Sequence, residues 1–541
     1  MQKTCRQCAK QFKITREDLE HLDKVSPIIG GQKQQILPPT LCQDCRRQRR
    51  LAFRNEQYIY LRKCDLCKTD IITIYSPDKP LPVYCSKCWW GDDWDPLECG
   101  RNFDFSRPFF DQFKELSAKV PVPPNMVFSS ENCEYCGFCV NSRNSYLSSR
   151  VGDSEDIYYS YLAVGSQNCT DCYNIINCQL CYECIDCWNC YATVFSRLCK
   201  TTSDSAFCYD CIGCKNCFGC FGLRNAEYYF FNQKCSKEEY EKKVRALQLE
   251  KPENLERAKE MFEKFILEKP HRATIINNCQ NVSGDFIVDS KDAHDCYDIE
   301  KIESAKNVWS SEYSKDIYDC DFIYGGEKCY ENMSNANSNG ILFSAVAITG
   351  VNDCLYSALV CNGTQNCFGC ASLKKQKHCI LNKQYSKEEY ENLVPKIIEH
   401  MKKTGEWGEF FPATLSNFAY NETVAQSYFP LTKEQALTNG FMWKDRETQQ
   451  KHAAAENLIT CKTCNKQFKL VAAEIEFYKK MHLPPPAKCH DCRHAARGAL
   501  RRPRRLYPRT CDKCQDPIQT TFAPTRPETV YCESCYLKEV Y

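Results

Sequence analysis

Apolar and polar positions follow one another over short distances through the middle of the chain. Segments of roughly ten to thirteen residues, rich in Ile, Val, Tyr and Cys, recur at 154–164, 167–176, 291–300 and 351–360. Short, evenly spaced and β-prone segments are typical of a β-solenoid, in which each coil buries its inward residues on the next coil. We therefore expect a multi-domain, mainly β chain whose middle is a Cys-rich β-solenoid similar to a parallel β-helix.

The middle is duplicated, because two stretches match at a constant shift of 150 residues. Cys211, Cys217, Cys220 and Asn232 recur as Cys361, Cys367, Cys370 and Asn382. Ser236 with Glu239, Ser386 with Glu389 and Thr432 with Gln435 have the capping-box pattern that begins a helix. An apolar stripe from Leu255 to Ile266 predicts a further helix that ends before Pro270. We expect solenoid halves at 131–235 and 276–385, with a helical insert at 236–275 and a helical linker at 386–455.

Cysteine pairs with the spacing CxxC cluster at both ends of the chain. Four pairs lie between Cys5 and Cys88 and four between Cys461 and Cys535. The last three pairs of the two sets match at a shift of 447 residues and the first pair at 456, so one loop differs by nine residues. We interpret this pattern as a duplicated tandem module, at 1–98 and at 456–541.

Two CxxC turns present four sulfurs to one metal ion and complete the tetrahedral Cys₄ shell of a structural zinc site. The second site of each module has the loop length of a zinc ribbon. The first has a longer loop that bears a helix and leads into a basic helical stretch, which favours a treble clef. We expect four zinc ions per chain, bound by Cys5, Cys8, Cys42 and Cys45; by Cys64, Cys67, Cys85 and Cys88; by Cys461, Cys464, Cys489 and Cys492; and by Cys511, Cys514, Cys532 and Cys535.

The first site of the C-terminal module has the sequence TCKTCNKQFKLVAAEIEFYKKMHLPPPAKCHDCRHAAR. It resembles an uncharacterised bacterial family of probable zinc-ribbon domains, with CxxC, a short strand containing Phe, a helix and a Pro-rich CxxCR. The resemblance covers about forty residues at each end of the chain. It implies zinc binding and a treble-clef type of fold, and it implies no reaction.

The remaining cysteines allow two interpretations. Arrays between Cys178 and Cys220 invite an iron–sulfur site, but their spacing does not lengthen before the fourth cysteine and no Pro follows it. The 150-residue shift also pairs Cys208 with Ala358 and Cys214 with Thr364, a replacement that a ligand set would not survive. We therefore favour buried thiols packed inside the solenoid, and keep an iron–sulfur redox protein as the alternative.

Charge is segregated along the chain. Residues 1–88 and 461–541 each carry eight more Lys and Arg than Asp and Glu, whereas 89–460 has a net charge of −14. After the CxxC of each first site, arginines recur every four residues, so they share one helix face. These are Arg46, Arg50 and Arg54, and Arg493, Arg497 and Arg501. We expect them to contact the phosphates of RNA or DNA; the alternatives are that they offset the charge of the zinc centre or dock on the acidic middle.

The rest of the chain adds little chemistry. Five phenylalanines between Phe103 and Phe113 predict an apolar cover for an open solenoid end, within a linker at 99–130.

We find none of the common catalytic motifs, and Cys₄ shells leave zinc no open position, so we expect no enzyme. The longest near-apolar run, 341–351, is too short for a membrane span, and there is no secretory h-region. We therefore expect a cytoplasmic, zinc-stabilised binding or scaffold protein that contacts nucleic acid, or alternatively a protein-only assembly scaffold that self-associates.

Overall fold

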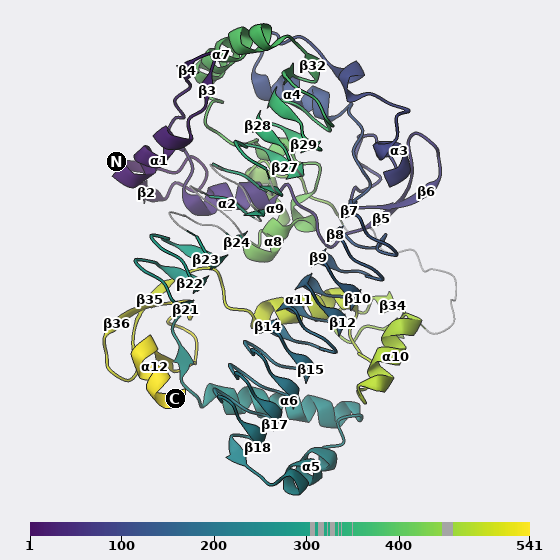
Figure 1. Cartoon of the computed structure of the whole chain (residues 1–541), viewed down its shortest axis with the longest axis vertical. Helices are drawn as coiled ribbons and strands as arrows, with labels where there is room; N and C mark the ends of the chain where they lie inside the picture. Colours follow the sequence, from purple (N-terminus) through teal and green to yellow (C-terminus); the bar gives the residue numbers. More distant parts are fainter. Residues whose placement is uncertain are drawn as a thin grey trace. The chain divides into compact units, whose positions relative to one another are not determined.

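The computed structural model describes residues 1–302, 309–311, 319–321, 323–324, 330–333, 335–336, 338–348, 350–445 and 458–540. The chain forms two compact units, each made of two separate stretches. One unit combines Met1–Pro124 with Ile275–Asp445, and the other combines Asn125–Thr274 with Arg446–Tyr541 (Figure 1). Each end of the chain therefore belongs with the half of the middle that is farther away in the sequence. The last ten residues of the expected helical linker, 446–455, lie outside the described residues.

The second unit contains a stack of short parallel strands. Each strand pairs with the strand twelve residues further along, as Tyr161 does with Tyr173 and Tyr173 with Ile185. Only the last pair is antiparallel, between β18 and β19. The strands are β7 (Met126–Phe128), β8 (Phe138–Val140), β9 (Ser149–Gly152), β10 (Glu155–Tyr158), β11 (Tyr161–Val164), β12 (Gln167–Thr170), β13 (Tyr173–Ile176), β14 (Ile185–Trp188), β15 (Tyr191–Val194), β16 (Ser203–Ala206), β17 (Lys215–Phe218), β18 (Glu227–Phe230) and β19 (Gln233–Lys234).

A finer period of three residues runs through this stack. From Asn141 to Phe231 every third residue has a positive φ, so the chain bends four times in each twelve-residue segment. Asn, Asp and Gly hold many of these positions, because they enter the left-handed region at least cost. The residue after each bend points inward, and nearly all of these inward residues are buried Cys, Ser, Thr, Ala, Val or Ile. The three-residue period is visible in the sequence in runs of cysteines such as Cys178, Cys181, Cys184, Cys187 and Cys190.

Hydrogen bonds explain why the inward positions hold so many thiols and hydroxyls. Ser142 Oγ donates to the Val140 carbonyl at 2.7 Å and accepts from the backbone N–H of Ser154 at 3.2 Å. The thiol of Cys169 likewise donates to the Gln167 carbonyl at 3.2 Å. A buried backbone group that lacked such a partner would be destabilising. Small side chains with one donor and one acceptor therefore suit a narrow interior better than larger apolar residues do.

The first unit contains a second parallel stack, with less regular spacing. Its pairs are separated by eleven residues (Ile276 with Ile287), twelve (Gly284 with Cys296) and thirteen (Cys354 with Cys367). The last two strands pair antiparallel. The strands are β21 (Ile276–Asn277), β22 (Gly284–Val288), β23 (Cys296–Glu300), β24 (Trp309–Ser311), β25 (Ile323–Tyr324), β26 (Asn335–Ala336), β27 (Ala345–Ile348), β28 (Asn352–Leu355), β29 (Ala358–Cys361), β30 (Gln365–Phe368), β31 (Cys379–Ile380) and β32 (Lys383–Gln384).

The ends of the two stacks are built alike. Asn232 exchanges two hydrogen bonds with the backbone of Phe221, both at 2.8 Å, and Asn382 does the same with Ala371 at 2.8 and 2.9 Å. Ser236 and Ser386 then cap α5 (Lys237–Ala246) and α7 (Lys387–Thr404), as the sequence predicts. The other helices of this middle region are α6 (Pro252–Leu267), α8 (Val424–Tyr428) and α9 (Lys433–Thr438), and Thr432 caps α9 as predicted.

The phenylalanine cluster lies against the stack of the first unit and against the helix that follows the end of that stack. Phe109 begins α4 (Phe109–Ser117), and its ring lies 5.4 Å from that of Tyr356 and 5.5 Å from that of Phe368. Those two residues belong to successive segments of the stack in the first unit. Phe103 and Phe105 lie against His400 of α7, with ring centroids 5.6 and 5.9 Å apart. Gly369 has a positive φ, and a Cβ there would meet the Phe109 ring at 2.7 Å, so the glycine leaves room for this aromatic cover.

Candidate metal centres

Four groups of cysteines have their sulfur atoms within 4.8 Å of one another. They are the four sets expected from the sequence: Cys5, Cys8, Cys42 and Cys45; Cys64, Cys67, Cys85 and Cys88; Cys461, Cys464, Cys489 and Cys492; and Cys511, Cys514, Cys532 and Cys535. In the parts of the chain that the structure describes, no other cysteine, histidine or acidic residues gather in this way. The arrays between Cys178 and Cys220 are buried in the stack, where thiols such as Cys184 donate to backbone carbonyls, which gives no support to the iron–sulfur alternative.

Each centre is built from a turn between two strands and from the start of a helix. In the C-terminal module, Cys461 and Cys464 lie between β33 (Ile459–Thr460) and β34 (Gln467–Phe468), and Cys489 caps α11 (His490–Leu500). The second centre of this module has the same arrangement as the first, although its loop length in the sequence indicated a zinc ribbon. Its last pair lies at the start of α12 (Glu533–Val540), after β35 (Tyr507–Thr510), β36 (Pro517–Thr520) and β37 (Val530–Tyr531).

The N-terminal module repeats this arrangement. Cys42 caps α2 (Gln43–Leu51), and Cys85 caps α3 (Ser86–Trp90). Its other elements are β1 (Gln2–Thr4), β2 (Gln11–Lys13), α1 (Arg16–Val25), β3 (Ile28–Ile29), β4 (Gln32–Lys33), β5 (Tyr60–Lys63) and β6 (Asp70–Thr73), and the C-terminal module has α10 (Ala472–Lys480) in place of α1. Both ends of the chain therefore carry two treble-clef-like centres.

The sulfur geometry fits a zinc ion. Zn–S bonds of about 2.3 Å in a tetrahedron require sulfurs about 3.8 Å apart. The Sγ atoms of Cys464 and Cys489 are separated by 3.6 Å and those of Cys514 and Cys532 by 3.8 Å. The corresponding pairs of the N-terminal module, Cys8 with Cys42 and Cys67 with Cys85, are separated by the same 3.6 and 3.8 Å.

Backbone N–H groups favour the thiolate form of the first cysteine of each C-terminal centre, Cys461 and Cys511. The Sγ of Cys461 accepts from the backbone N–H of Cys489 at 3.3 Å and of Thr463 at 3.5 Å. Burial opposes ionisation of Cys461, but these and neighbouring N–H groups outweigh it and lower its pKa to about 6. The same balance lowers the pKa of Cys511 to about 6. Four thiolates fill a tetrahedral shell, so zinc bound here would stabilise the fold and have no site for substrate.

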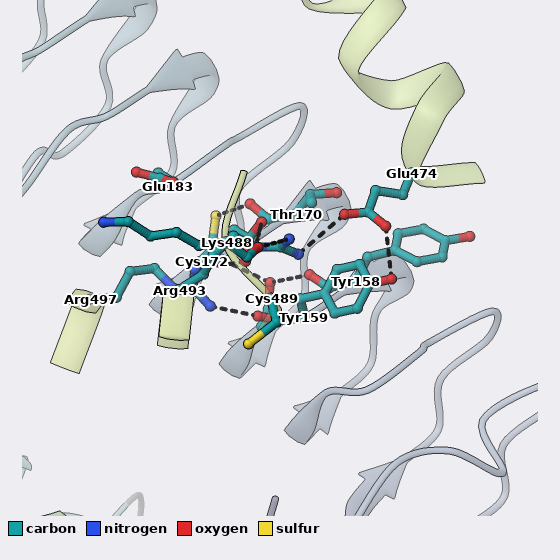
Figure 2. Close-up of polar contacts among 12 residues, drawn as sticks. Tyr158, Tyr159, Thr170, Cys172, Glu183, Glu474, Lys488, Cys489, Arg493 and Arg497 are labelled. Carbon is teal, nitrogen blue, oxygen red and sulfur yellow. Dashed lines mark hydrogen bonds and ion pairs between the residues drawn. The ribbon is translucent and has the colours of Figure 1, made fainter. Parts of the chain in front are cut away.

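The predicted basic face of α11 lies against the stack of its own unit. Arg493 Nε and Arg497 Nη1 both donate to Asp171 Oδ1, at 3.0 and 2.6 Å. Arg493 also donates to Glu474 of α10 at 3.1 Å, and Arg497 to the Tyr159 carbonyl at 2.9 Å. Figure 2 shows both arginines, Glu474 and Tyr159 gathered in one place. Burial alone would raise the pKa of Asp171, but the two guanidinium groups lower it.

Arg501 completes this face. It holds Asp186 by two hydrogen bonds, Nε to Oδ2 at 3.2 Å and Nη2 to Oδ1 at 2.8 Å. Its guanidinium also lies over the ring of Tyr173, 4.7 Å from the centroid, and Arg493 lies over Tyr159 at 4.8 Å. Charge pairing and ring stacking together account for the burial of all three arginines.

The N-terminal module docks on the stack of the first unit in a similar way. Arg50 Nε donates to Asp321 Oδ2 at 2.9 Å, and both side chains are 0 % exposed. Arg46 pairs with Asp319, and Arg54 pairs with Glu56. Arg49, which the sequence pattern does not single out, donates to both oxygens of Glu331 at 2.9 Å.

The six arginines predicted to contact phosphates are thus paired within the chain. Their expected role is corrected here, because side chains that are at most 8 % exposed are not available to a nucleic-acid backbone. For five of them the structure favours the alternative interpretation, docking on the acidic middle, whereas Arg54 pairs with Glu56 of its own module. The acidic partners were missed in the sequence, although a signal existed: Asp171 and Asp321 are related by the 150-residue shift, as Arg50 and Arg497 are by the 447-residue shift.

Comparison with known proteins agrees with the metal centres. No curated protein matches the chain in sequence. None of the described helices has the length and apolar character needed to cross a membrane. The model of the family described as "Probable treble clef domain" matches residues 456–500, which include Cys461, Cys464, Cys489 and Cys492. This segment is therefore a treble clef domain of that family, as the resemblance in its sequence implied.

Proposed function

We propose that each of the two parallel stacks is a β-solenoid and that the protein is a non-catalytic scaffold in which each zinc module clamps the stack of its own unit. The observation that supports this proposal best is the duplicated buried ion pair between module and stack, Arg497 with Asp171 and Arg50 with Asp321. A buried pair of this kind contributes little net stability but is costly to break, so it specifies one docked arrangement.

Two further observations agree with a scaffold in a reducing compartment such as the cytoplasm. The stack interior is filled by small side chains, and thiols such as Cys172 and Cys187 donate hydrogen bonds there as S–H groups. The sixteen cysteines of the metal centres have complete Cys₄ shells when zinc is bound, so the metal supplies folding free energy and no reaction.

Thiol labelling of the full chain tests the clamp. After a zinc chelator is added, we expect the sixteen ligand cysteines to react with an alkylating reagent while the inward cysteines between Cys133 and Cys220 stay protected. Arg497→Gln should accelerate labelling of the C-terminal module, whereas Arg505→Gln, an exposed arginine of the same module, should not. If the inward thiols react as fast as the ligand thiols, the modules do not clamp a stack that is stable by itself.

Nucleic-acid binding is a second candidate, carried by a different set of residues. Arg6, Lys10 and Lys13 beside the first N-terminal centre recur as Lys462, Lys466 and Lys469 at the 456-residue shift. Five of these six side chains are exposed, and Lys466 is half-buried, where it pairs with Asp491 at 3.2 Å. We propose that these two sets of basic residues, and not the arginine faces, contact the phosphates of RNA or DNA.

A salt titration of the full chain against mixed-sequence RNA and duplex DNA tests this candidate. Binding should weaken with salt, with a log–log slope of about −0.9 per phosphate contacted on duplex DNA. Replacing Arg6, Lys13, Lys462 and Lys469 by Gln should flatten that slope by roughly three to four units, if each contacts one phosphate. The control replaces exposed lysines of a stack, Lys375 and Lys377. No measurable affinity at low salt, or equal slopes for both variants, would eliminate the candidate.

A further inference from the structure

Three tryptophans of the N-terminal module surround one lysine of the stack in the same unit. The Nζ of Lys374 lies 4.9 Å from the ring centroid of Trp89, 5.9 Å from that of Trp90 and 4.6 Å from that of Trp94. It also donates to the Trp89 carbonyl. All three distances are within the range of cation–π attraction. Lys374 is therefore the occupant of an aromatic cage.

Contacts that do not involve the lysine hold the walls of this cage. The indole N–H of Trp89 donates to the Pro121 carbonyl at 3.2 Å, and that of Trp94 donates to the Trp89 carbonyl at 3.0 Å. The rings of Trp89 and Trp90 meet at 88° with centroids 4.6 Å apart, and Tyr84 meets Trp94 edge-on at 5.6 Å. The cage is thus held by contacts within its own module and with Pro121 of the adjoining linker, so removing Lys374 would leave its walls in place.

Acidic residues add to the affinity of this cage for a cation. The tryptophans belong to the sequence WWGDDWD at 89–95, and Asp92 and Asp95 are near enough to act electrostatically on Lys374. Burial nevertheless outweighs these carboxylates and lowers the pKa of Lys374. The ammonium group is therefore imperfectly solvated in the cage, and a cation that is less strongly hydrated would fit it better.

The second unit shows that docking does not require a cage. Tyr536 takes the place of Trp89 at the 447-residue shift, and Arg224 takes the place of Lys374 at the 150-residue shift. There the contact is a polar chain in which Tyr536 donates to Asp210 and Arg224 pairs with Asp210 at 3.2 Å. Both units therefore share one contact between module and stack. The first unit adds Trp90, Trp94 and the acidic residues, which that contact does not need.

We propose that Trp89, Trp90 and Trp94 form a binding site for a quaternary ammonium group on a partner, and that Lys374 fills this site as a displaceable internal ligand. A trimethylated lysine of a protein fits this chemistry, because its methyl groups contact the ring faces and its charge is weakly hydrated. While Lys374 occupies the cage, the site is closed to such a partner. Its displacement exchanges one cation for another and leaves the zinc centre at Cys64, Cys67, Cys85 and Cys88 unchanged.

Fluorine NMR of the full chain labelled with 5-fluorotryptophan tests this proposal, with tetramethylammonium chloride as the probe. Lys374→Met keeps an unbranched side chain that is one atom shorter, and it removes the charge. We expect this variant to give saturable shifts of the cage tryptophans at a concentration at least tenfold lower than the unchanged protein needs. The matched control, Lys377→Met, changes an exposed lysine outside the cage and should behave as the unchanged protein. Adding Trp94→Leu to Lys374→Met should abolish the response.

Two ligands then distinguish the source of the cation. A peptide with trimethyllysine should bind the Lys374→Met variant more tightly than choline does if the partner is a protein, whereas equal or tighter binding of choline would overturn that part of the proposal. Equal probe affinity for the Lys374→Met and unchanged proteins would overturn the proposal that Lys374 closes the site. Loss of folding in both Lys374→Met and Lys374→Ala, seen as loss of zinc, would overturn it too, because the lysine would then be indispensable.

Discussion

Arg497 of α11 and Asp171 of the parallel stack form a buried ion pair, with Nη1 2.6 Å from Oδ1. Arg50 stands 447 residues before Arg497, and Asp321 stands 150 residues after Asp171, and these two also form a buried pair, at 2.9 Å. The two shifts come from separate repeats, one of the zinc modules and one of the stacks. Both repeats preserve the same contact, so docking of a module on a stack is a property of the duplicated unit.

Asp171→Asn should destabilise the second unit strongly. It removes the carboxylate that pairs with Arg497 and one of the two that pair with Arg493, and breaking a buried pair from one side costs about 3–5 kcal/mol. Urea unfolding of the full chain measures this loss. The matched control is Asp153→Asn, an exposed aspartate that also has a positive φ, for which we expect a change within about 0.5 kcal/mol. Equal effects of the two substitutions would contradict the docking role of Asp171.

The zinc content should be four ions per chain by elemental analysis, one for each Cys₄ centre. Cys511→Ser should lower this number to three and should unfold α12 and its neighbouring strands, because structural zinc supplies on the order of 10 kcal/mol to a small module. Cys208→Ser, in the stack, serves as the control and should keep all four ions. Iron in the purified protein, or a zinc content well above four, would show that thiols of the stack also bind metal.

Inward cysteines should tolerate small replacements and reject large ones. The thiol of Cys208 is 3.6 Å from the Ala206 carbonyl and 3.8 Å from that of Cys217, both weak hydrogen bonds. Cys208→Ala should therefore cost about 1 kcal/mol or less, whereas Cys208→Leu overfills the interior and should cost about 1–3 kcal/mol or more. Thermal unfolding of the full chain measures both effects. A larger loss for Ala than for Leu would indicate that the thiol does more than fill space.

The stability of the second unit should fall between pH 7 and pH 5 because of His271. Burial lowers the pKa of this histidine to about 4, and the charge of Arg502 acts in the same direction although Glu528 opposes it. Above the ordinary value of 6.5 the ring is neutral in both states, and its full contribution to stability is present. As the pH falls towards 4, the unfolded chain takes up a proton that the folded chain does not, so stability is lost. The expected loss at pH 5 is about 2 kcal/mol.

His271→Gln isolates this contribution. The ring Nε2 lies 3.1 Å from the Ile266 carbonyl, and a Gln amide can donate there in place of the imidazole without titrating. Urea unfolding at pH 7 and pH 5 should then show a smaller pH dependence for the variant than for the unchanged protein. Other titrating groups affect both proteins alike, so an identical pH dependence would mean that His271 takes up its proton in the folded state as well.

Local spacing was enough to predict the metal centres. A CxxC turn places two sulfurs beside each other whatever surrounds it, so the sixteen cysteines grouped as the spacing indicates. Helix starts such as Ser386 and Thr432 were predictable for the same reason, since a cap depends on four neighbouring residues. The recurrence of a small inward residue at every third position was also present in the sequence, although the longer segments of ten to thirteen residues obscured it.

The partners of the arginine faces could not be predicted in this way. The helical period indicates that Arg493, Arg497 and Arg501 share a face, but it does not say whether that face meets a phosphate or a carboxylate. Only the tertiary structure brings Asp171 and Asp186 under α11, from more than three hundred residues away. It also pairs each end of the chain with the more distant half of the middle. Local patterns fix turns, caps and ligand sets because these depend on adjacent residues, whereas docking depends on the path of the whole chain and on which buried charges must find partners.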